Sequence, residues 1–266
     1  MIFNFLKTFL LILIFSFLIV SNSLAKNTFL KNGSIYNGEI VFKFNKYLLP
    51  DGNWTLVNKS GESVPGTNLQ ISCIHFLNEK NAYVEGYFEI CDLTTGGKWT
   101  PQIAFIISNL VKNDRYDNCN LKPEYYYSKY ISIGNTSNCF VFRHIDVTKE
   151  INYPDDPNTS FDFFREYLEN KNLTLPKIMI GSRHLFFAPS VKDKAVEIKH
   201  YINPELIGAP ATIESNENLT EYHRGNIKNY PEKKKIVDIF LQDRIKFHKN
   251  FEILMKAKKH HKIDFN

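Results

Sequence analysis

Alternation of apolar and polar residues along the first half of the chain is the feature that most restricts its fold. Within Tyr83–Cys91, for example, Val84, Phe88 and Ile90 share one side of the alternation. A period of two residues is typical of a strand with one buried face. An aromatic fraction of 14%, mainly 22 Phe and 14 Tyr, also favours strands. The predicted strands are Glu39–Asn45, Asn53–Asn58, Leu69–Leu77, Tyr83–Cys91, Tyr125–Ile133 and Asn138–Val147.

Turn-forming residues separate several of these segments. We expect turns at Pro50-Asp51-Gly52, Lys59-Ser60-Gly61 and Gly134-Asn135, because Gly, Pro, Asn and Asp adopt turn conformations readily. The stretch Pro101–Lys112 fits a strand or a short helix equally well.

The second half of the chain combines strands with helices. A polar segment containing two prolines, Tyr153–Asn158, interrupts the strand pattern, and a helix is predicted at Phe161–Asn170 with Ser160 as its N-cap. Lys177–Ala188 and Ala195–Ile202 form a predicted hairpin. The sequence therefore predicts an α+β protein, mainly antiparallel β, with a β-rich subdomain at 26–152 and an α+β subdomain at 159–266. The alternative is one continuous domain.

A long amphipathic helix is predicted at Pro231–Lys258, since proline suits the first helical turn. Arg244 falls within the apolar stripe and needs a polar partner, whereas Ile245 and Ile253 fall on the polar side. We expect this helix to close the fold rather than to form a free membrane-seeking tail. The apolar stripe consists of Ile236, Val237, Phe240, Phe247, Phe251, Leu254 and Met255.

Positive charge is concentrated at this end of the chain. Residues 231–266 hold ten Lys or Arg and five Asp or Glu, and their net charge of +5 equals that of the whole chain. No nucleic-acid recognition motif accompanies this charge. The helix therefore suggests an anionic membrane surface or an acidic envelope polymer as the partner, and a solvated helix face is the simpler alternative.

The N-terminal segment 1–25 has the layout of a secretory signal peptide. Lys7 precedes an apolar run, Thr8–Val20, and small residues stand at Ser23 and Ala25. The run of 13 residues is shorter than the ~20 that span a bilayer as a helix. We expect cleavage between Ala25 and Lys26 and a periplasmic or extracellular mature protein. The alternative is an uncleaved helix that anchors the protein in the inner membrane.

Four cysteines in the mature chain suggest disulfide bonds, and their spacing contains no Cys-x-x-Cys motif of a zinc site or redox pair. A hairpin loop at Asn78–Asn81 would place Cys73 opposite Tyr87, about 13 Å along the strand from Cys91. That distance disfavours a Cys73–Cys91 bond unless a bulge shifts the register. Cys119–Cys139 meets no such objection and is the favoured pair.

Histidines provide the main candidates for chemistry. The predicted hairpin places His184 and His200 on one face, as diagonal neighbours, where two imidazoles could bind a metal or act as acid and base. Glu221 and His223 form a weaker pair. The alternative is that these histidines are structural, hydrogen-bonded residues at the edge of the core. Gly61–Thr67 imitates a phosphate loop but lacks its lysine, so neither a cofactor nor a resident metal is predicted.

Two short segments resemble a known group of proteins. Leu49-Pro50-Asp51-Gly52-Asn53-Trp54 is similar to the Leu-Pro-x-Gly-x-Trp segment near the mature start of uncharacterised secreted proteobacterial proteins, and Asn203–Gly208 looks like a second shared element. The resemblance implies export but no activity. We therefore expect an exported, non-catalytic envelope protein that binds a partner or surface. The alternative is a secreted hydrolase with a pocket lined by His184 and His200.

Overall fold

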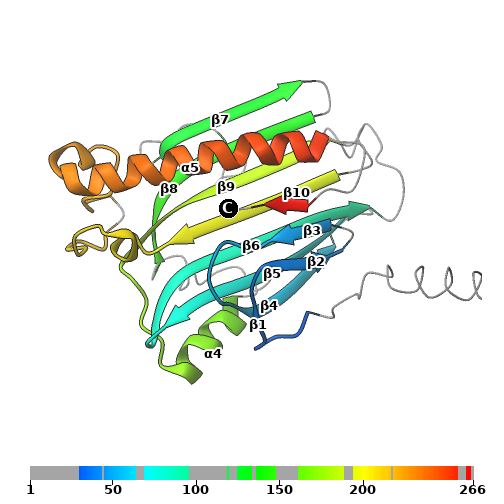
Figure 1. Ribbon diagram of the computed structural model, residues 1–266, viewed down its shortest axis with the longest axis horizontal. Coiled ribbons are helices and arrows are strands. Elements are labelled where there is room, and N and C mark those ends of the chain that lie inside the picture. The colour runs from blue at the N-terminus through cyan, green and yellow to red at the C-terminus, as the bar shows by residue number, and fades with distance from the viewer. Residues whose placement is uncertain are drawn as a thin grey trace, which may run out of the picture.

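The fold is a mainly antiparallel sheet with a short middle helix and a long C-terminal helix, which confirms the predicted class (Figure 1). The computed structural model describes residues 30–43, 45–63, 69–95, 119, 125–133, 136–147, 161–188, 194–216, 218–256 and 262–264. The predicted signal segment, Pro101–Lys112, Gly134-Asn135 and Tyr153–Asn158 lie outside the described residues. No described helix is long and apolar enough to cross a membrane.

Eight antiparallel strands form the main sheet, in the order β1-β4-β5-β6-β10-β9-β8-β7. A second sheet has the order β11-β3-β2. Because β6 pairs with β10 and β8 with β9, strands from both sides of Tyr153–Asn158 belong to one sheet. The strands are β1 (Ile35–Tyr36), β2 (Glu39–Phe42), β3 (Asn45–Leu48), β4 (Trp54–Ser63), β5 (Leu69–Lys80), β6 (Tyr83–Thr95), β7 (Tyr125–Ile133), β8 (Thr136–Asp146), β9 (Ile178–Ala188), β10 (Lys194–Ile202) and β11 (Lys262–Asp264).

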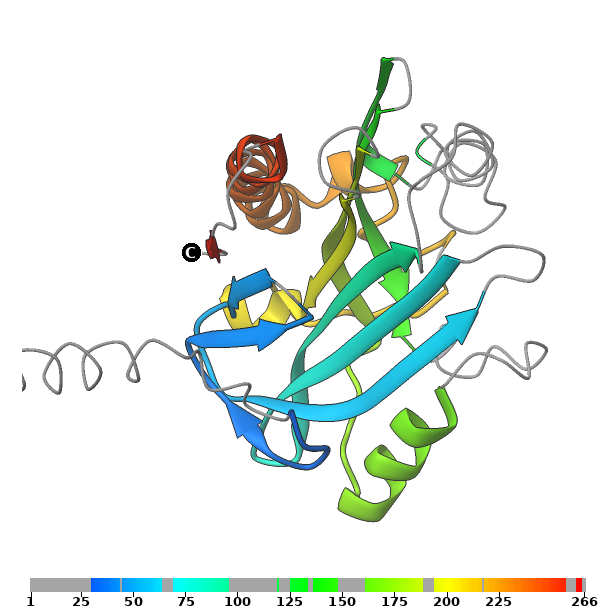
Figure 2. The same cartoon turned by 90° about the vertical axis from the view of Figure 1, so that its right-hand side faces the viewer.

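The two helices of the described part of the chain pack on opposite faces of the main sheet (Figures 1 and 2). Helix α5 (Pro231–Lys256) begins at the predicted proline and buries Val237, Phe247 and Phe251 against the sheet, so it closes the fold as expected. Ile245, expected on the exposed side, instead packs partly buried against the core, whereas Ile253 is 67% exposed. Short 3₁₀ helices, η1 (Pro204–Ile207) and η2 (Ile227–Asn229), precede α5.

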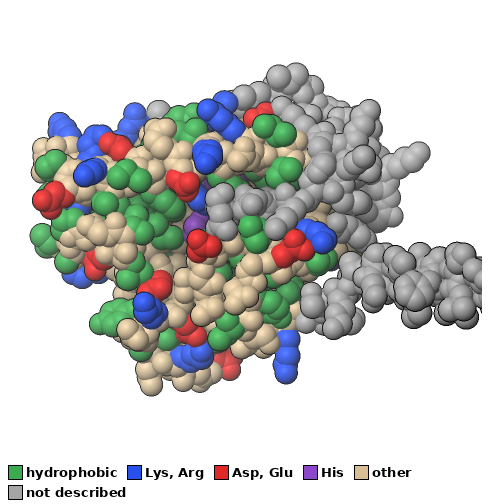
Figure 3. Space-filling model, viewed as in Figure 1, with side chains coloured by type: hydrophobic (Ala, Val, Ile, Leu, Met, Phe, Trp, Pro, Cys, Tyr) green, Lys and Arg blue, Asp and Glu red, His purple; other side chains and the backbone are tan. Residues whose placement is uncertain are grey.

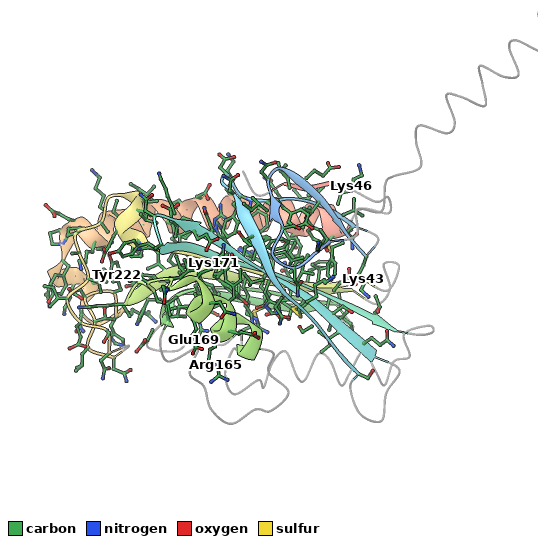
Figure 4. The ribbon with its side chains drawn as sticks, turned by 90° about the horizontal axis from the view of Figure 1, so that it is seen from below. Lys43, Lys46, Arg165, Glu169, Lys171 and Tyr222 are labelled. Carbon is green, nitrogen blue, oxygen red and sulfur yellow. A yellow bond between two sulfur atoms is a disulfide. The ribbon has the colours of Figure 1, made fainter. Side chains whose placement is uncertain are left out.

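Helix α4 (Phe161–Lys171) packs on the other face and is fastened to the end of β5. Lys171 Nζ lies 2.6 Å from Glu79 Oε1, and Tyr167 donates a hydrogen bond of 2.9 Å to the same oxygen. Figure 4 shows Lys171 on this helix, beneath the strands. Leu168 packs with Met179 in the small core on this side of the sheet.

The β5–β6 hairpin has a different register from the one expected. The turn lies at Asn81-Ala82 rather than at Asn78–Asn81, and both turn residues have positive φ (52° and 63°). A bulge between Asn78 and Glu79 shifts the pairing further, so that Cys73 lies opposite Cys91 rather than Tyr87. The two cysteines form a disulfide, and Cys119–Cys139 forms a second.

Two other local predictions are wrong. Lys59-Ser60-Gly61 continues β4 instead of forming a turn, because β4 remains paired with β5 as far as Gln70. The predicted strand Glu39–Asn45 divides into β2 and β3, and Lys43 between them has a positive φ of 53°. By contrast, Pro50-Asp51-Gly52 forms the expected bend before Trp54, whose side chain is buried.

Candidate functional site

His184 and His200 lie diagonally across β9 and β10, as the hairpin pattern predicts. His184 pairs with Ile198 in the ladder, and His200 pairs with Ser182. Both side chains point toward α5, are at most 5% exposed and meet two residues of that helix, Arg244 and His248. We call His184, His200, Arg244 and His248, with Ser182, the histidine clasp.

Hydrogen bonds in the clasp require an unprotonated ring nitrogen on His200 and on either His184 or His248. Arg244 Nη1 donates to His200 Nδ1 at 2.9 Å, and a guanidinium is only a donor, so this ring nitrogen must be unprotonated. His184 Nδ1 and His248 Nδ1 are 3.1 Å apart, so one of them must accept the bond. His184 Nε2 lies 2.8 Å from Ser182 Oγ. Protonation of these rings would replace attraction with repulsion.

Aromatic rings enclose the clasp. His184 stacks on Phe140 with 4.8 Å between ring centroids, and His200 lies between Trp54 and Phe240, at 5.9 Å from each. A low-dielectric surrounding of this kind disfavours the charged form of a histidine.

The pKa values of the clasp follow from this burial. Burial, followed by neighbouring positive groups, holds the pKa of His184 and of His200 well below the usual 6.5. The pKa of His248 is lowered to about 4. Burial is the largest cause, Glu252 acts in the opposite direction, and Lys129 of β7 acts in the same direction as burial. Asp243 pairs with the Arg244 guanidinium at the outer edge.

The clasp fastens α5 to the sheet and leaves little capacity for catalysis. Both ring nitrogens of His184 are engaged, and one ring face is covered by Phe140. These contacts match the structural alternative for the pair. Among the described residues, the one group of three potential metal ligands is Cys73, Glu89 and Cys91, and its two sulfur atoms form a disulfide.

Glu221 and His223 have separate partners. Glu221 accepts hydrogen bonds from Lys233 Nζ at 3.1 Å and from the Ile213 amide at 2.9 Å. Burial alone would raise the pKa of Glu221, but these backbone and lysine donors lower it to about 2. His223 Nδ1 accepts from the Gly225 amide at 3.1 Å.

The Glu221–Lys233 ion pair is buried and ties the start of α5 to the preceding loop. Lys233 also lies 4.9 Å from the ring centroid of Tyr222, at the end of the molecule labelled in Figure 4. The ion pair therefore anchors the start of α5.

A second polar network crosses the opposite face of the sheet. Ser60, His75, Tyr87, Glu89 and Lys199 come from β4, β5, β6 and β10, and we call them the polar belt. Ser60 Oγ lies 3.2 Å from His75 Nε2, and His75 Nδ1 lies 2.9 Å from the Tyr87 hydroxyl. That hydroxyl donates to Glu89 Oε2, while Lys199 Nζ lies 3.3 Å from Glu89 Oε1.

The belt continues as alternating charges across β10 and β9. Lys199 lies 3.5 Å from Glu197, which accepts two hydrogen bonds from Arg183 at 2.8 and 3.1 Å. Burial alone would raise the pKa of Glu89, but Lys199, His75 and Tyr87 hold it well below its usual range. Glu89 is therefore a buried carboxylate that stays ionised.

Sequence reasoning missed His248 and the polar belt. His248 follows Arg244 by four residues and lies on the buried side of α5, so the helix period contained a signal for it. His75 and Glu89 face each other only in the observed register, since the expected one places His75 opposite Glu85. Ser60 was assigned to a turn.

The outer side of α5 carries a distinct surface. Ile239 and Ile253 are 59% and 67% exposed, and they lie on the side of the helix away from the buried Val237, Phe247, Phe251 and Met255. At 100° per residue, Lys235, Lys246 and Lys249 lie on the same side of the helix as these isoleucines. We call these five residues the outer strip. Figure 3 shows basic and hydrophobic side chains, with some acidic ones, along this helix.

Comparisons of the chain with protein-family models, with curated proteins and with solved structures find no match. The assignment of function therefore depends on the clasp, the belt and the outer strip.

Proposed function

We propose that the protein is an exported binding protein that attaches to an anionic membrane surface through the outer strip of α5. The observation that carries the proposal is the exposure of Ile239 and Ile253 among three lysines, on a helix whose other side is occupied by the sheet. Apolar side chains flanked by lysines are typical of helices that lie at an anionic lipid interface.

Neighbouring acidic residues oppose this attraction only in part. Asp238 pairs with Lys234 and Asp243 pairs with Arg244, so each of these carboxylates already has a cation beside it. The three lysines of the strip would each contribute about 1 kcal/mol at an anionic surface. Burying the exposed parts of two isoleucines would add about 1–2 kcal/mol each. The total corresponds to reversible binding, in roughly the micromolar to sub-millimolar range.

An extracytoplasmic location is consistent with binding to a membrane surface. Two disulfides indicate an oxidising, extracytoplasmic environment. We propose that the chain reaches it through the signal segment, with cleavage between Ala25 and Lys26, and that the mature protein is periplasmic or extracellular.

A hydrolase centred on His184 and His200 has less support. Each ring is buried, His200 accepts a hydrogen bond from Arg244, His184 is hydrogen-bonded to His248, and aromatic side chains surround both rings. A general acid must carry a proton near the working pH and must reach its substrate. A binding role is therefore the better account of α5 and its clasp.

Co-sedimentation with lipid vesicles tests the proposal. The mature, disulfide-bonded protein should bind vesicles that contain phosphatidylglycerol and should bind neutral phosphatidylcholine vesicles at least tenfold more weakly. The double variant Lys246→Glu/Lys249→Glu should lose this difference, while Lys31→Glu/Lys80→Glu, which makes the same charge change on exposed residues away from α5, should retain it. Equal binding of both variants, or binding to an acidic polysaccharide but to neither vesicle, would contradict the membrane proposal.

A further inference from the structure

We propose that Ser60 is a nucleophile activated by His75, and that Ser60, His75, Tyr87 and Glu89 form a catalytic site for the hydrolysis of carboxylic esters. The inference concerns the face of the sheet opposite α5 and does not depend on membrane binding.

Hydrogen-bond geometry fixes the roles of these four groups. The Tyr87 hydroxyl has one proton, which it donates to the ionised Glu89, so its oxygen must accept the proton of His75 Nδ1. The lone pair of His75 is then on Nε2, 3.2 Å from Ser60 Oγ. The serine O–H donates to this lone pair, which is the arrangement that a general base requires.

The four hydrogen-bonded residues Ser60, His75, Tyr87 and Glu89, which we call the relay, are more buried at the Glu89 end than at the Ser60 end, as catalysis needs. The side chains of Glu89 and His75 are 7% and 12% exposed, which protects the orienting groups from water. Ser60 is half-buried, and the next residue, Gly61, is exposed, so the serine lies at the end of the network nearest to solvent. Lys199 keeps Glu89 ionised from the far side, away from the serine.

The proposed reaction proceeds in two balanced steps. Ser60 Oγ attacks the ester carbonyl carbon while its proton passes to His75 Nε2, and the alkoxide leaves with that proton as the C–O bond breaks. Water then attacks the acyl-serine, gives a proton to Nε2, and the carboxylic acid departs as the proton returns to Ser60 Oγ. An ester fits this set because its leaving group needs only the one proton that Nε2 carries, and the reaction needs neither a metal nor a redox partner.

The test is covalent labelling of the mature, disulfide-bonded protein with a fluorophosphonate probe, followed by peptide mass spectrometry. We expect the label on Ser60, at a rate about 10²–10⁴-fold above that of an unassisted serine. Ser60→Ala should abolish the label and the hydrolysis of p-nitrophenyl acetate. Ser34→Ala, at another half-buried serine, should change neither.

Variants of the relay distinguish a catalytic role from a structural one. His75→Gln should reduce labelling at least 100-fold. Tyr87→Phe keeps the ring but breaks the proton chain, and it should reduce labelling at least tenfold with an unchanged far-UV circular dichroism spectrum. An unlabelled Ser60 in the folded protein, or labelling that Tyr87→Phe leaves unchanged, would overturn the proposal.

Discussion

Lowering the pH from 7.5 to 5 should weaken the attachment of α5 to the sheet, because burial in the histidine clasp disfavours charged imidazoles. In the unfolded chain each histidine has a pKa of about 6.5. In the folded protein the pKa of His184 and of His200 lies well below that value, and that of His248 is about 4. Below pH 6.5 the unfolded state therefore binds protons that the folded state does not, and the free energy of unfolding falls as the pH falls.

The magnitude follows from these pKa differences. A buried imidazole with a folded-state pKa of about 4, such as His248, loses about 2 kcal/mol of stabilisation between pH 7.5 and pH 5, and His184 and His200 change in the same direction. Asp92 acts in the opposite direction, because burial raises its pKa to about 6 and its protonation returns about 1 kcal/mol. Glu89 and Glu221, whose pKa values are lowered, lose their contributions only below about pH 4.5. The loss from the three histidines exceeds the gain from Asp92, so the folded protein is less stable at pH 5 than at pH 7.5.

Urea unfolding at pH 7.5 and pH 5, followed by circular dichroism, measures this loss. His248→Gln should reduce the difference between the two pH values by about 2 kcal/mol, since one titrating ring is removed. His223→Gln, a histidine variant outside the clasp, is the matched control and should leave the difference unchanged. A wild-type difference below 1 kcal/mol would refute the reasoning.

Three further variants test the fold. Gly181→Ala should cost about 3 kcal/mol or more in urea unfolding, because its Cβ would lie 2.3 Å from the Tyr201 ring, whereas Gly61→Ala has 3.7 Å of space and should change stability little. Ala82→Gly should raise the free energy of unfolding by about 0.5–1 kcal/mol, since φ is 63° at this turn position; a loss of stability would contradict this. Truncation before Pro231 should lower the melting temperature markedly or prevent soluble expression, and normal melting of the truncated protein would contradict the role of α5.

Elements with a strong period were predictable from sequence. Strand β7 has the predicted bounds Tyr125–Ile133, and α5 begins at the predicted Pro231. The diagonal arrangement of His184 and His200 was also predictable, because the hairpin pattern specifies which residues share a face. The period of apolar and polar residues predicts the elements and their buried faces well, because this period follows directly from which side chains are buried.

The register of the β5–β6 hairpin was not predictable from the sequence. The error in this register concealed both the Cys73–Cys91 pair and the polar belt. The β5–β6 turn uses Asn81-Ala82 in the left-handed region, where glycine is the usual signal, and hydrogen bonds between Thr174 and both Ala82 and Val84 support it. Moving this turn and adding the bulge shifts the pairing by four residues. The shift brings Cys73 opposite Cys91, and it also brings His75 opposite Glu89, which creates the polar belt.

The most direct test of membrane attachment is the depth of the outer strip in a lipid bilayer. Ile253→Trp places a fluorophore within the proposed contact, and Ile35→Trp places one at a position of nearly equal exposure on β1 (67% and 64%). With anionic vesicles that contain lipids brominated near the head group, we predict strong quenching of the added fluorescence at position 253 and little at position 35. Equal quenching at both positions, or none at position 253, would contradict the account.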